Sequence, residues 1–388
     1  MTQTEAMHVA ADAISVPVPP HLADADIEAA VRVLRSGRLT GANHPEVIAF
    51  EEELASWSGV GHTVSVSSGT AALHCILLAM GIGPGDEVIV PAHTFIASAT
   101  PVLMAGATPV IVDVDAETYC IDPDAAAAAV GPRTKAVIAV HINGHPAPMD
   151  LLPKDIPVIS DACQAHGATL DGKPVGTLGV AAALSFFEGK LLTAAGEGGA
   201  VLTSNEEMAD RIKLLREHGL QRIGDGPDSH HVILGYNYRL TGVQAAVARS
   251  QLGRLGALIA NRRARAEQLT TLLADLPGLA VPTVKAGAGH VYWRYVMRIT
   301  NDLERADLLK ALAAEGVGAA PRYPIPLTIQ PALTNTARIC PCPVTDMLSS
   351  RLIMLTPPAS AAAVEDLAAA IHRAVRARSA PASRPRLP

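Results

Sequence analysis

The segment SFFEGKLLTAAGEGGA, residues 185–200, places a single lysine between an apolar run and a glycine-rich turn. Lys190 follows Phe186 and Phe187, two of the four phenylalanines in the chain. Apolar neighbours disfavour the ammonium form, so they lower the pKa of a lysine and free its amine to act as a nucleophile. A lysine in a loop can equally be an ordinary surface residue, and other groups must decide between the two.

Two other segments offer groups that could act together with this lysine. Small residues in SSGTAAL (67–73) open a predicted helix, and a helix N-terminus binds phosphate through its free N–H groups and its dipole. The same residues could serve only as an N-cap. Asp161 ends the apolar run PVIS, where an unpaired carboxylate would be costly. It either caps the next segment or pairs with a bound molecule.

A phosphate site, a carboxylate and a reactive lysine together match the needs of pyridoxal 5′-phosphate. This cofactor has a phosphate to be held, a ring nitrogen that a carboxylate stabilises, and an aldehyde that condenses with a lysine amine. The sequence therefore predicts pyridoxal phosphate as the cofactor. Phe95, just after VIVPAHT, could offer a flat face to its ring, or could pack in the core.

Strands that alternate with helices must position these groups. Runs rich in β-branched residues, each read as a strand, occur at residues 88–91, 109–115, 136–141, 157–162, 182–187 and 200–203. Helical patterns occur at 47–59 and 70–81, and loops or helices separate most of the strands. This alternation indicates an α/β fold with a mostly parallel sheet. Ligands of such sheets bind at the carboxyl ends of the strands, where Asp161 and Lys190 would lie.

The pattern changes after residue 240. A long helical stretch follows at 241–273, which Gly256 could break, and a strand at 295–300 with helices at 302–315 and 360–377 indicates a smaller α+β domain. We therefore predict four segments along the chain: a flexible N-terminus at 1–15, a large cofactor-binding domain at 16–240, a smaller C-terminal domain with its linking helix at 241–377, and a flexible tail at 378–388.

Composition restricts the class of protein and its partners. The 388 residues are 49% hydrophobic and 18% charged, as in a globular chain, and the net charge of −6 with scattered basic residues argues against nucleic acid. No apolar run reaches the roughly 18 residues needed to span a bilayer, and the start does not resemble a signal peptide. Five irregularly spaced cysteines favour a reducing compartment, so we predict a cytoplasmic protein. We predict no metal site, since His141 and His145 lie in a strand-end loop.

Five segments taken together resemble a known family: SSGTAAL, VIVPAHTFIASA, ISDACQAHGA, SFFEGKLLTAAGEGGAV and GYNYRLTGVQAAV. The chain is similar to the DegT/StrS family of pyridoxal-phosphate-dependent sugar and cyclitol aminotransferases, from about Gly37 to the final helix. The resemblance implies a fold-type I aminotransferase, with a large domain built on a mostly parallel sheet flanked by helices and a smaller C-terminal α+β domain.

The resemblance also implies roles for single residues around the cofactor ring. Lys190 is expected to form the covalent link to the cofactor and to act in catalysis. Asp161 is expected to bind the pyridinium nitrogen, and Gln164 to lie near the ring hydroxyl. Phe95 is expected to stack on the ring.

The phosphate of the cofactor is expected to contact residues from three segments. Thr70 and Ala71 of SSGTAAL and Ser185 of SFFEGK would hold it within one subunit. Asn237 of GYNYRL would reach it from the other subunit, as the resemblance implies. We therefore expect a homodimer with two shared active sites.

Two segments, GKLLTAAGEGGAV and CPVTDMLSSRLIML, look closest to 3-amino-5-hydroxybenzoate synthases and approach the cyclitol aminotransferases. This resemblance implies transfer of an amino group from L-glutamine, or L-glutamate, to a ketone on a cyclitol, sugar or similar cyclic polyol in antibiotic and natural-product biosynthesis. One alternative is a dehydrating and aromatising enzyme like 3-amino-5-hydroxybenzoate synthase. Another is a non-catalytic regulatory protein that binds the cofactor, which the joint presence of Lys190, Asp161 and Gln164 disfavours.

The chain departs from the family pattern in places that bear on the substrate. Thr328 stands where a histidine usually follows the PL of YPxPL, which disfavours a sugar-nucleotide substrate. The segment 141–161 is too short for a full helix before the strand that ends at Asp161. Four residues are candidate substrate contacts, although each could be a packing or surface residue instead: His93, Glu188, Arg322 and Tyr323.

Overall fold

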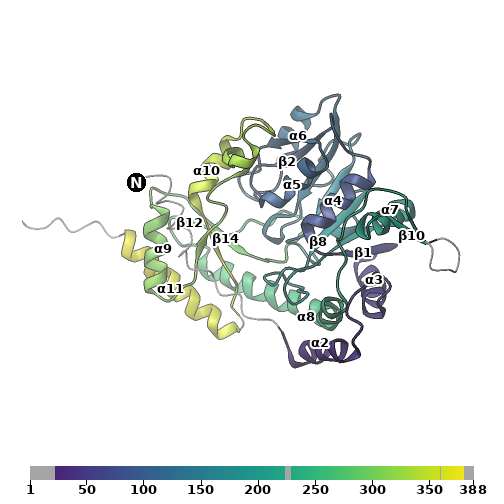
Figure 1. The fold of residues 1–388 in the computed structure, drawn as a ribbon. Coiled ribbons are helices and arrows are strands. Elements are labelled where there is room, and N and C mark those ends of the chain that lie inside the picture. Colours follow the sequence, from purple (N-terminus) through teal and green to yellow (C-terminus); the bar gives the residue numbers. More distant parts are fainter. Residues whose placement is uncertain (1–21, 223–228, 359, 380–388) are drawn as a thin grey trace, which may run out of the picture.

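The computed structural model describes residues 22–222, 229–358 and 360–379 (Figure 1). An eight-stranded sheet forms the centre of the larger part, in the order β1-β9-β8-β5-β4-β2-β3-β16. Its strands are β1 (His62–Val66), β2 (Glu87–Pro91), β3 (Thr108–Val112), β4 (Thr134–Val140), β5 (Val158–Asp161), β8 (Ala181–Ser185), β9 (Gly199–Thr203) and β16 (Arg338–Ile339). Neighbouring strands are parallel except at β9, which is antiparallel to both β1 and β8. The prediction of a mostly parallel sheet is confirmed.

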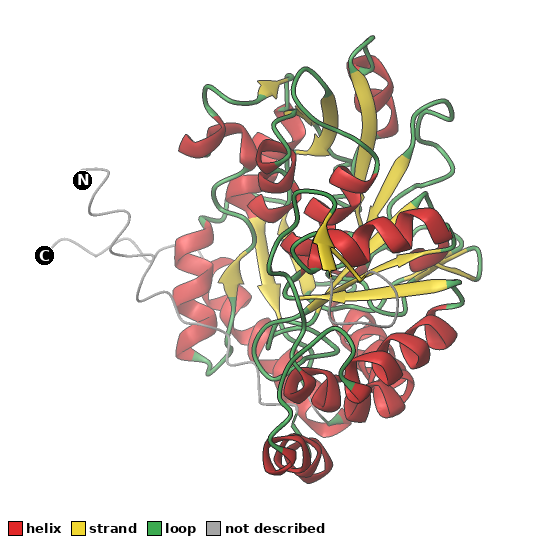
Figure 2. Ribbon diagram, turned by 45° about the vertical axis from the view of Figure 1, so that its right-hand side comes forward, coloured by secondary structure: helices red, strands yellow, loops and turns green. Residues whose placement is uncertain are grey.

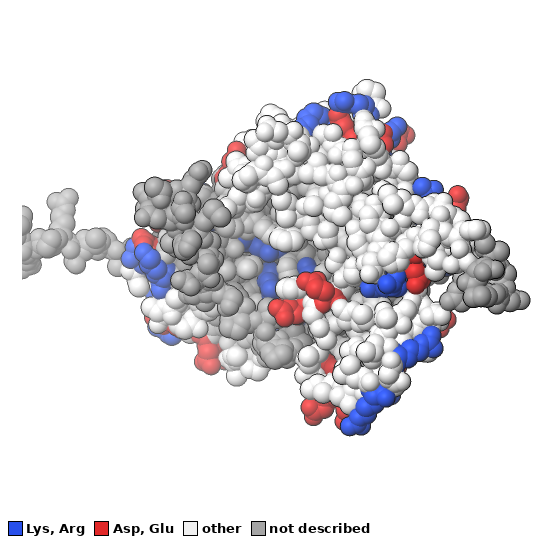
Figure 3. Space-filling model, viewed as in Figure 1, with Lys and Arg blue, Asp and Glu red and all other residues white. Residues whose placement is uncertain are grey.

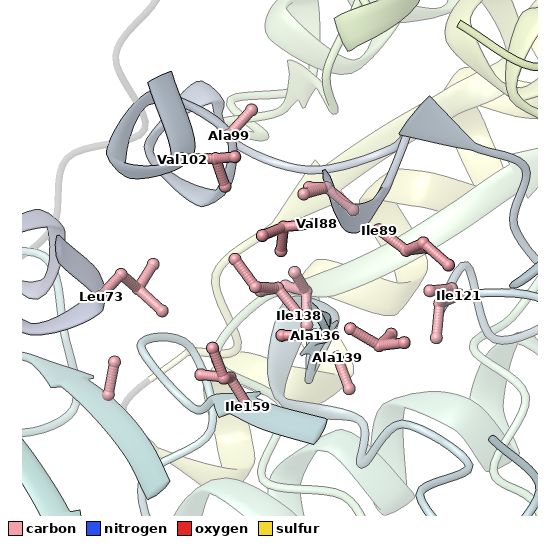
Figure 4. Close-up of a cluster of buried hydrophobic side chains, with 14 of the residues drawn as sticks. Leu73, Val88, Ile89, Ala99, Val102, Ile121, Ala136, Ile138, Ala139 and Ile159 are labelled. Carbon is pink, nitrogen blue, oxygen red and sulfur yellow. The ribbon is translucent and has the colours of Figure 1, made fainter. Parts of the chain in front are cut away.

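The central strands are apolar along their length because helices cover both faces of the sheet (Figure 2). Val88, Ile89 and Ile138 of adjacent strands are completely buried and pack against one another. Figure 4 shows them together with Leu73 and Val102, which come from helices over the sheet. The six apolar runs read as strands correspond to β2, β3, β4, β5, β8 and β9.

Helices of the larger part surround this sheet. They are α2 (Asp24–Ser36), α3 (Pro45–Ser58), α4 (Gly69–Ala79), α5 (Thr100–Met104), α6 (Pro123–Ala129) and α7 (Glu206–Arg216), with 3-10 turns η1 (Ile96–Ser98), η2 (Ile142–Gly144) and η3 (Val175–Thr177). The expected helices at 47–59 and 70–81 are α3 and α4. Only η2 and irregular backbone connect β4 to β5, which confirms that the segment 141–161 holds no full helix.

A second sheet, antiparallel and four-stranded, forms the smaller part in the order β12-β14-β17-β15. Its strands and helices are β12 (Leu279–Ala280), β14 (Tyr295–Ile299), β15 (Ala320–Pro321), β17 (Leu352–Leu355), α9 (Arg305–Ala314) and α11 (Ala361–Ser379). The long helix α8 (Gly242–Leu273) packs on α2 and α3 and also on α11, so it links the two parts. It is continuous, and the expected break at Gly256 is wrong: that residue faces open space, where a helix tolerates glycine at a cost of about 1 kcal/mol.

The C-terminal half of the chain also returns to the large sheet. β16 pairs with β3, and Asp113 after β3 accepts hydrogen bonds from the N–H groups of Val344 and Thr345, at 2.8 Å each, at the start of α10 (Pro343–Arg351). The predicted division at residue 240 therefore separates the two main sheets with the exception of β16.

Remaining elements are short. They are β6 (Thr169–Leu170), β7 (Lys173–Pro174), β10 (Leu220–Arg222), β11 (Ser229–His231), β13 (Ala288–Gly289), η4 (Leu327–Ile329) and η5 (Pro331–Leu333). The predicted flexible segments at 1–15 and 380–388 lie outside the described residues, whereas 378–379 continue α11. In the parts of the chain that the structure describes, no helix is long and apolar enough to cross a membrane.

Candidate active site

A cavity of about 550 Å³ opens where the carboxyl ends of β5 and β8 meet the smaller sheet. Residues from both parts of the chain line it, including eight of those expected from the sequence: Thr70, Phe95, Asp161, Gln164, Ser185, Lys190, Arg322 and Tyr323. Figure 3 shows Lys and Arg atoms inside a hollow on the visible face, with Asp and Glu atoms beside them. Another cavity, of about 600 Å³ between α8 and α11, holds none of the expected residues.

Lys190 lies in a turn after β8, where its backbone N–H donates to the Phe187 carbonyl oxygen at 2.9 Å. Its Nζ lies 4.2 Å from the centroid of the Trp293 ring. Burial, together with the positive charges of Arg322 and Arg294, lowers the pKa of Lys190 to about 8, against the opposing effect of Cys163 and Asp161. The lysine is therefore a much better nucleophile near neutral pH than an exposed lysine.

The aromatic wall beside Lys190 differs from the one expected. Phe187 lines the cavity, but Phe186 is buried and packs against Phe50 with the ring centroids 5.4 Å apart. Trp293 supplies the ring that faces the amine, and its indole N–H donates to the Gly189 carbonyl oxygen at 2.6 Å. Trp293 therefore fixes the turn that carries Lys190 and also shields the lysine amine from water.

Asp161 ends β5 and is almost fully buried at the wall of the cavity. The Ser98 hydroxyl donates to its Oδ2 at 2.8 Å and the Cys163 N–H donates to its Oδ1 at 3.2 Å. Within the described ranges no lysine or arginine pairs with this carboxylate. A buried carboxylate of this kind favours a cationic partner, which a protonated pyridine nitrogen would supply.

Small residues at the start of α4 allow this helix to approach the strand ends closely. A Cβ on Gly69 would come within 2.7 Å of Cys163 Sγ and 2.9 Å of Ser185 Cβ, and a Cβ on Gly199 within 2.4 Å of the Ser68 carbonyl carbon. The first turn of a helix offers N–H groups without intrahelical partners, and Thr70 and Ser185 place hydroxyl-bearing side chains at the same wall. This arrangement fits a phosphate, so the cavity has the groups that pyridoxal phosphate needs.

Ala71, the third expected phosphate contact, lies in the first turn of α4, and its role stays a prediction. Its N–H donates to the Ser68 hydroxyl at 3.1 Å, and Ala71 is buried outside the cavity wall. Ser68 is therefore the N-cap of α4.

Gln164 ties the end of β5 to the smaller part of the chain. Its Oε1 accepts from the Asn143 N–H and from Arg322 Nη2, both at 2.9 Å, and its Nε2 donates to the Tyr323 hydroxyl at 3.1 Å. Tyr323 has a φ of +40°, in the left-handed region that non-glycine residues rarely adopt. Strain of this kind gathers at ligand sites, where surrounding contacts enforce it.

Three other expected residues do not line the cavity of their own chain. His93 is fully buried between the rings of Tyr119 and Tyr323, with centroids at 6.1 and 5.3 Å, and burial lowers its pKa to about 3. Glu188 is exposed outside the cavity wall, and Asn237 lies exposed in the loop before α8. The substrate roles of His93 and Glu188 therefore stay predictions, with His93 in contact with the cavity only through Tyr323.

Several cavity residues were missed by the sequence reasoning: Ser98, Glu197, Trp293 and Arg294. Trp293 and Arg294 precede β14 and reach the cavity because the Arg294 N–H donates to the Asn143 carbonyl oxygen at 3.2 Å, which holds two distant loops together. The only sequence signal was the aromatic and cationic pair in VYWRYV, just before a predicted strand. In the described residues no group of three or more metal-ligating side chains occurs.

Comparison with known proteins agrees with this geometry. The model of the DegT/DnrJ/EryC1/StrS aminotransferase family matches residues 5–375. The chain belongs to this family. It is therefore a pyridoxal-phosphate-dependent aminotransferase, since the family uses this cofactor for amino transfer.

Individual relatives act on different classes of substrate. The chain is 40% identical over 321 residues to dTDP-3-amino-3,4,6-trideoxy-alpha-D-glucose transaminase of Streptomyces venezuelae, covering 81% of this chain and 82% of the relative. It is 38% identical over 344 residues to L-glutamine:2-deoxy-scyllo-inosose aminotransferase of Streptomyces kanamyceticus, covering 83% and 80%. A crystal structure of 3-amino-5-hydroxybenzoic acid synthase matches with a TM-score of 0.86 and 36% identity, covering 94% of this chain and all of that one. The fold-type I architecture is thus confirmed, while the relatives leave the acceptor open.

Proposed function

We propose that this aminotransferase moves an amino group from L-glutamine, or L-glutamate, to a ketone on a cyclitol or similar cyclic polyol. The observation that carries the proposal is the cavity in which Lys190, with its pKa lowered to about 8, and the buried carboxylate of Asp161 meet at adjacent strand ends. These are the two groups that amino transfer with pyridoxal phosphate requires.

The residues at the cavity would hold the cofactor in the following way. Lys190 would form the covalent link, Asp161 would bind the ring nitrogen and Phe95 would cover one ring face. Phe95 is 58% exposed at the cavity wall. Thr70 and Ser185 would bind the phosphate. When bound, pyridoxal phosphate accepts the amino group at its aldehyde carbon and draws electrons away from the carbon that bears this group.

Lys190 would also move the proton in each half of the reaction. In its neutral form, Nζ removes the proton from the α-carbon of the donor, acting as a general base. In the second half it gives a proton to the acceptor carbon, acting as a general acid. Trp293 shields the Lys190 amine from water and, through its bond to Gly189, fixes the turn that carries the lysine. The Ser98 hydroxyl holds the carboxylate of Asp161 in its orientation.

The names of the relatives and one residue that differs from the family pattern support this choice of donor and acceptor. One relative is named for L-glutamine and a cyclic inosose, so we rank glutamine above glutamate. Thr328, in place of a histidine typical of the family, argues against a nucleotide sugar such as the one for which the Streptomyces venezuelae relative is named. The similarity to 3-amino-5-hydroxybenzoic acid synthase keeps a dehydrating and aromatising reaction as a second candidate. We do not retain the non-catalytic regulatory alternative.

We further propose a homodimer with shared active sites, in which Asn237 of the partner subunit contacts the phosphate. Phe95 and Phe187 are exposed apolar side chains at the cavity wall, and Leu234 is exposed in the segment before α8, which is consistent with such an interface. The cytoplasmic location stays a prediction.

The proposal is tested by loading the purified protein with pyridoxal phosphate and adding single amino acids. L-glutamine or L-glutamate should convert the visible absorption of the cofactor to that of the pyridoxamine form, and a cyclic ketone should reverse the change. Lys190→Ala should abolish both changes, whereas Lys213→Ala, on the exposed face of α7, should preserve them. A phenolic product without a stable amine would favour the aromatising alternative, and no conversion with any amino donor would refute the proposal.

A further inference from the structure

Three cationic side chains surround one indole ring in the cavity. Lys190 Nζ, the Arg294 guanidinium and the Arg322 guanidinium lie 4.2, 4.6 and 5.0 Å from the centroid of the Trp293 ring. All three line the cavity, and Arg322 is almost completely buried. Like charges placed so close together repel one another, so this cluster costs free energy unless an anion joins it.

Among the residues that the structure describes, neither arginine has a carboxylate partner. Arg322 donates from Nε to Asn143 Oδ1 at 2.8 Å and from Nη2 to Gln164 Oε1 at 2.9 Å, and both acceptors are neutral amides. Arg294 donates from Nη1 to the Thr356 hydroxyl at 3.1 Å, while its Nε is buried without a partner. In the part of the chain that the structure describes, no acidic side chain forms a salt bridge with either guanidinium.

Three other partly or fully buried arginines in the described residues pair with carboxylates: Arg216 bonds to Glu51, Arg249 bonds to two glutamates, and Arg254 bonds to the buried Asp26. Among the described residues, the two cavity arginines lack such a carboxylate, as Arg262 of α8 also does. What distinguishes them from Arg262 is that they lie together with Lys190 around one ring in the cavity. Burial lowers the pKa of Arg294 to about 10, with the charges of Arg322 and Arg262 contributing, which is the direction expected for a cation that lacks an anionic neighbour.

Neither acidic group that lines the cavity forms a salt bridge with the two arginines in the described residues. Asp161 accepts from Ser98 and Cys163, and Glu197 lies on the exposed glycine-rich turn. An anion that neutralises the arginines must therefore come from a ligand. The planar fork of a guanidinium matches a carboxylate, which can accept two parallel N–H bonds.

We propose that Arg294 and Arg322 form a carboxylate subsite, and that the acceptor is a cyclic ketone that carries a carboxylate. The inference rests on the proposed amino transfer and narrows its acceptor. In that reaction, donor and acceptor occupy the same cavity in turn. The subsite first receives the α-carboxylate of the amino donor, and a neutral acceptor would then leave both guanidiniums without a counter-charge in the second half. An acceptor ring that carries a carboxylate supplies this counter-charge again.

The test compares two probes that differ only in charge, 3-oxocyclohexane-1-carboxylate and 3-oxocyclohexane-1-carboxamide. Their affinities for the protein loaded with pyridoxamine phosphate are measured by calorimetry. The carboxylate should bind about 10- to 100-fold more tightly, the usual range for hydrogen bonds to a charged group. Equal affinities, tighter binding of the amide, or no binding of the carboxylate would overturn the inference.

Variants assign the preference to the two arginines. Arg294→Gln and Arg322→Gln should each remove most of the preference for the carboxylate while changing the affinity of the amide less than about threefold. Arg294→Lys should keep part of the preference, and Arg376→Gln, on the exposed face of α11, should keep all of it. Arg322→Gln could unfold because Asn143 and Gln164 lose their partner. In that case the affinities of the two probes for the unaltered chain still test whether a carboxylate subsite exists.

The readout separates this inference from the proposed function. Conversion of the cofactor by an amino donor tests amino transfer, and the affinity ratio of the two probes tests the subsite. A protein that converts the cofactor but binds both probes equally retains its proposed function and loses the subsite. A protein that prefers the carboxylate but converts with no donor retains an anion site and loses the proposed reaction.

Discussion

The lowered pKa of Lys190 predicts how fast the apoenzyme takes up its cofactor at different pH values. Only the neutral amine can attack the aldehyde of pyridoxal phosphate, so the rate should follow the deprotonated fraction of this one lysine. With a pKa of about 8, roughly a tenth of the amine is neutral at pH 7, about 300-fold more than for a lysine at the ordinary value of 10.5. The rate should rise between pH 6 and 8 and level off above about pH 9.

The assay is stopped-flow absorbance of pyridoxal phosphate mixed with apoenzyme. Arg322→Gln serves as a directional control, because the positive charge of Arg322 lowers the pKa of Lys190, and its removal should shift the midpoint to higher pH. A rate that keeps rising through pH 10 in the unaltered protein, or a midpoint that moves down in the variant, would refute the reasoning.

The same shift has a consequence for the stability of the apoenzyme. The unfolded chain binds a proton at Lys190 up to about pH 10.5, whereas the folded chain releases it near pH 8. Between these values the unfolded state binds more protons, so the contribution of Lys190 to the free energy of unfolding rises with pH across this window.

Other predictions concern the residues that support the site and the fold. Ser98→Ala removes a hydrogen bond to the buried Asp161 and should weaken pyridoxal phosphate binding about tenfold, as measured by equilibrium dialysis. Gly69→Ala should weaken it more, since its Cβ would meet Cys163 Sγ at 2.7 Å, whereas Gly256→Ala points into open space and should raise the unfolding free energy by about 0.5–1 kcal/mol in a urea titration. Asp113→Ala removes bonds to three N–H groups, those of Val114, Val344 and Thr345, and to the Thr345 hydroxyl. It should lower the free energy of unfolding by about 1–3 kcal/mol, with the melting temperature as readout. Unchanged cofactor affinity in the first two variants, or an unchanged melting temperature in the last, would contradict these assignments.

The sequence was sufficient for those parts of the fold that follow from local pattern. Fully apolar runs such as VIVP and AVIAV mark strands buried on both faces, and the strand-end rule brings Asp161 and Lys190 to one edge. β1 was missed because HTVSV is short and half polar, and its antiparallel pairing with β9 depends on a contact between segments more than 130 residues apart. The break at Gly256 was expected from propensity alone, which the packing of α8 on α2, α3 and α11 overrides.

The cavity wall was predicted less completely than the cofactor chemistry. Asp161 and Lys190 could be found because one ends an apolar strand and the other lies in the turn after one. Trp293 and Arg294 lie beside the lysine because the Arg294 N–H bonds to the Asn143 carbonyl oxygen in a distant loop. Asn143 has a left-handed φ of +58°, which no local sequence pattern predicted. His93 directly follows a predicted strand as well, yet its side chain points into the core, because the strand-end rule fixes the position of the backbone and not the direction of each side chain.

The most direct test of the central claim is the position at which the cofactor is attached. The protein loaded with pyridoxal phosphate is reduced with borohydride, digested, and its peptides are weighed by mass spectrometry. The account predicts one pyridoxyl phosphate group, carried by Lys190. An unlabelled chain, or a label on another lysine with residue 190 unmodified, would contradict it.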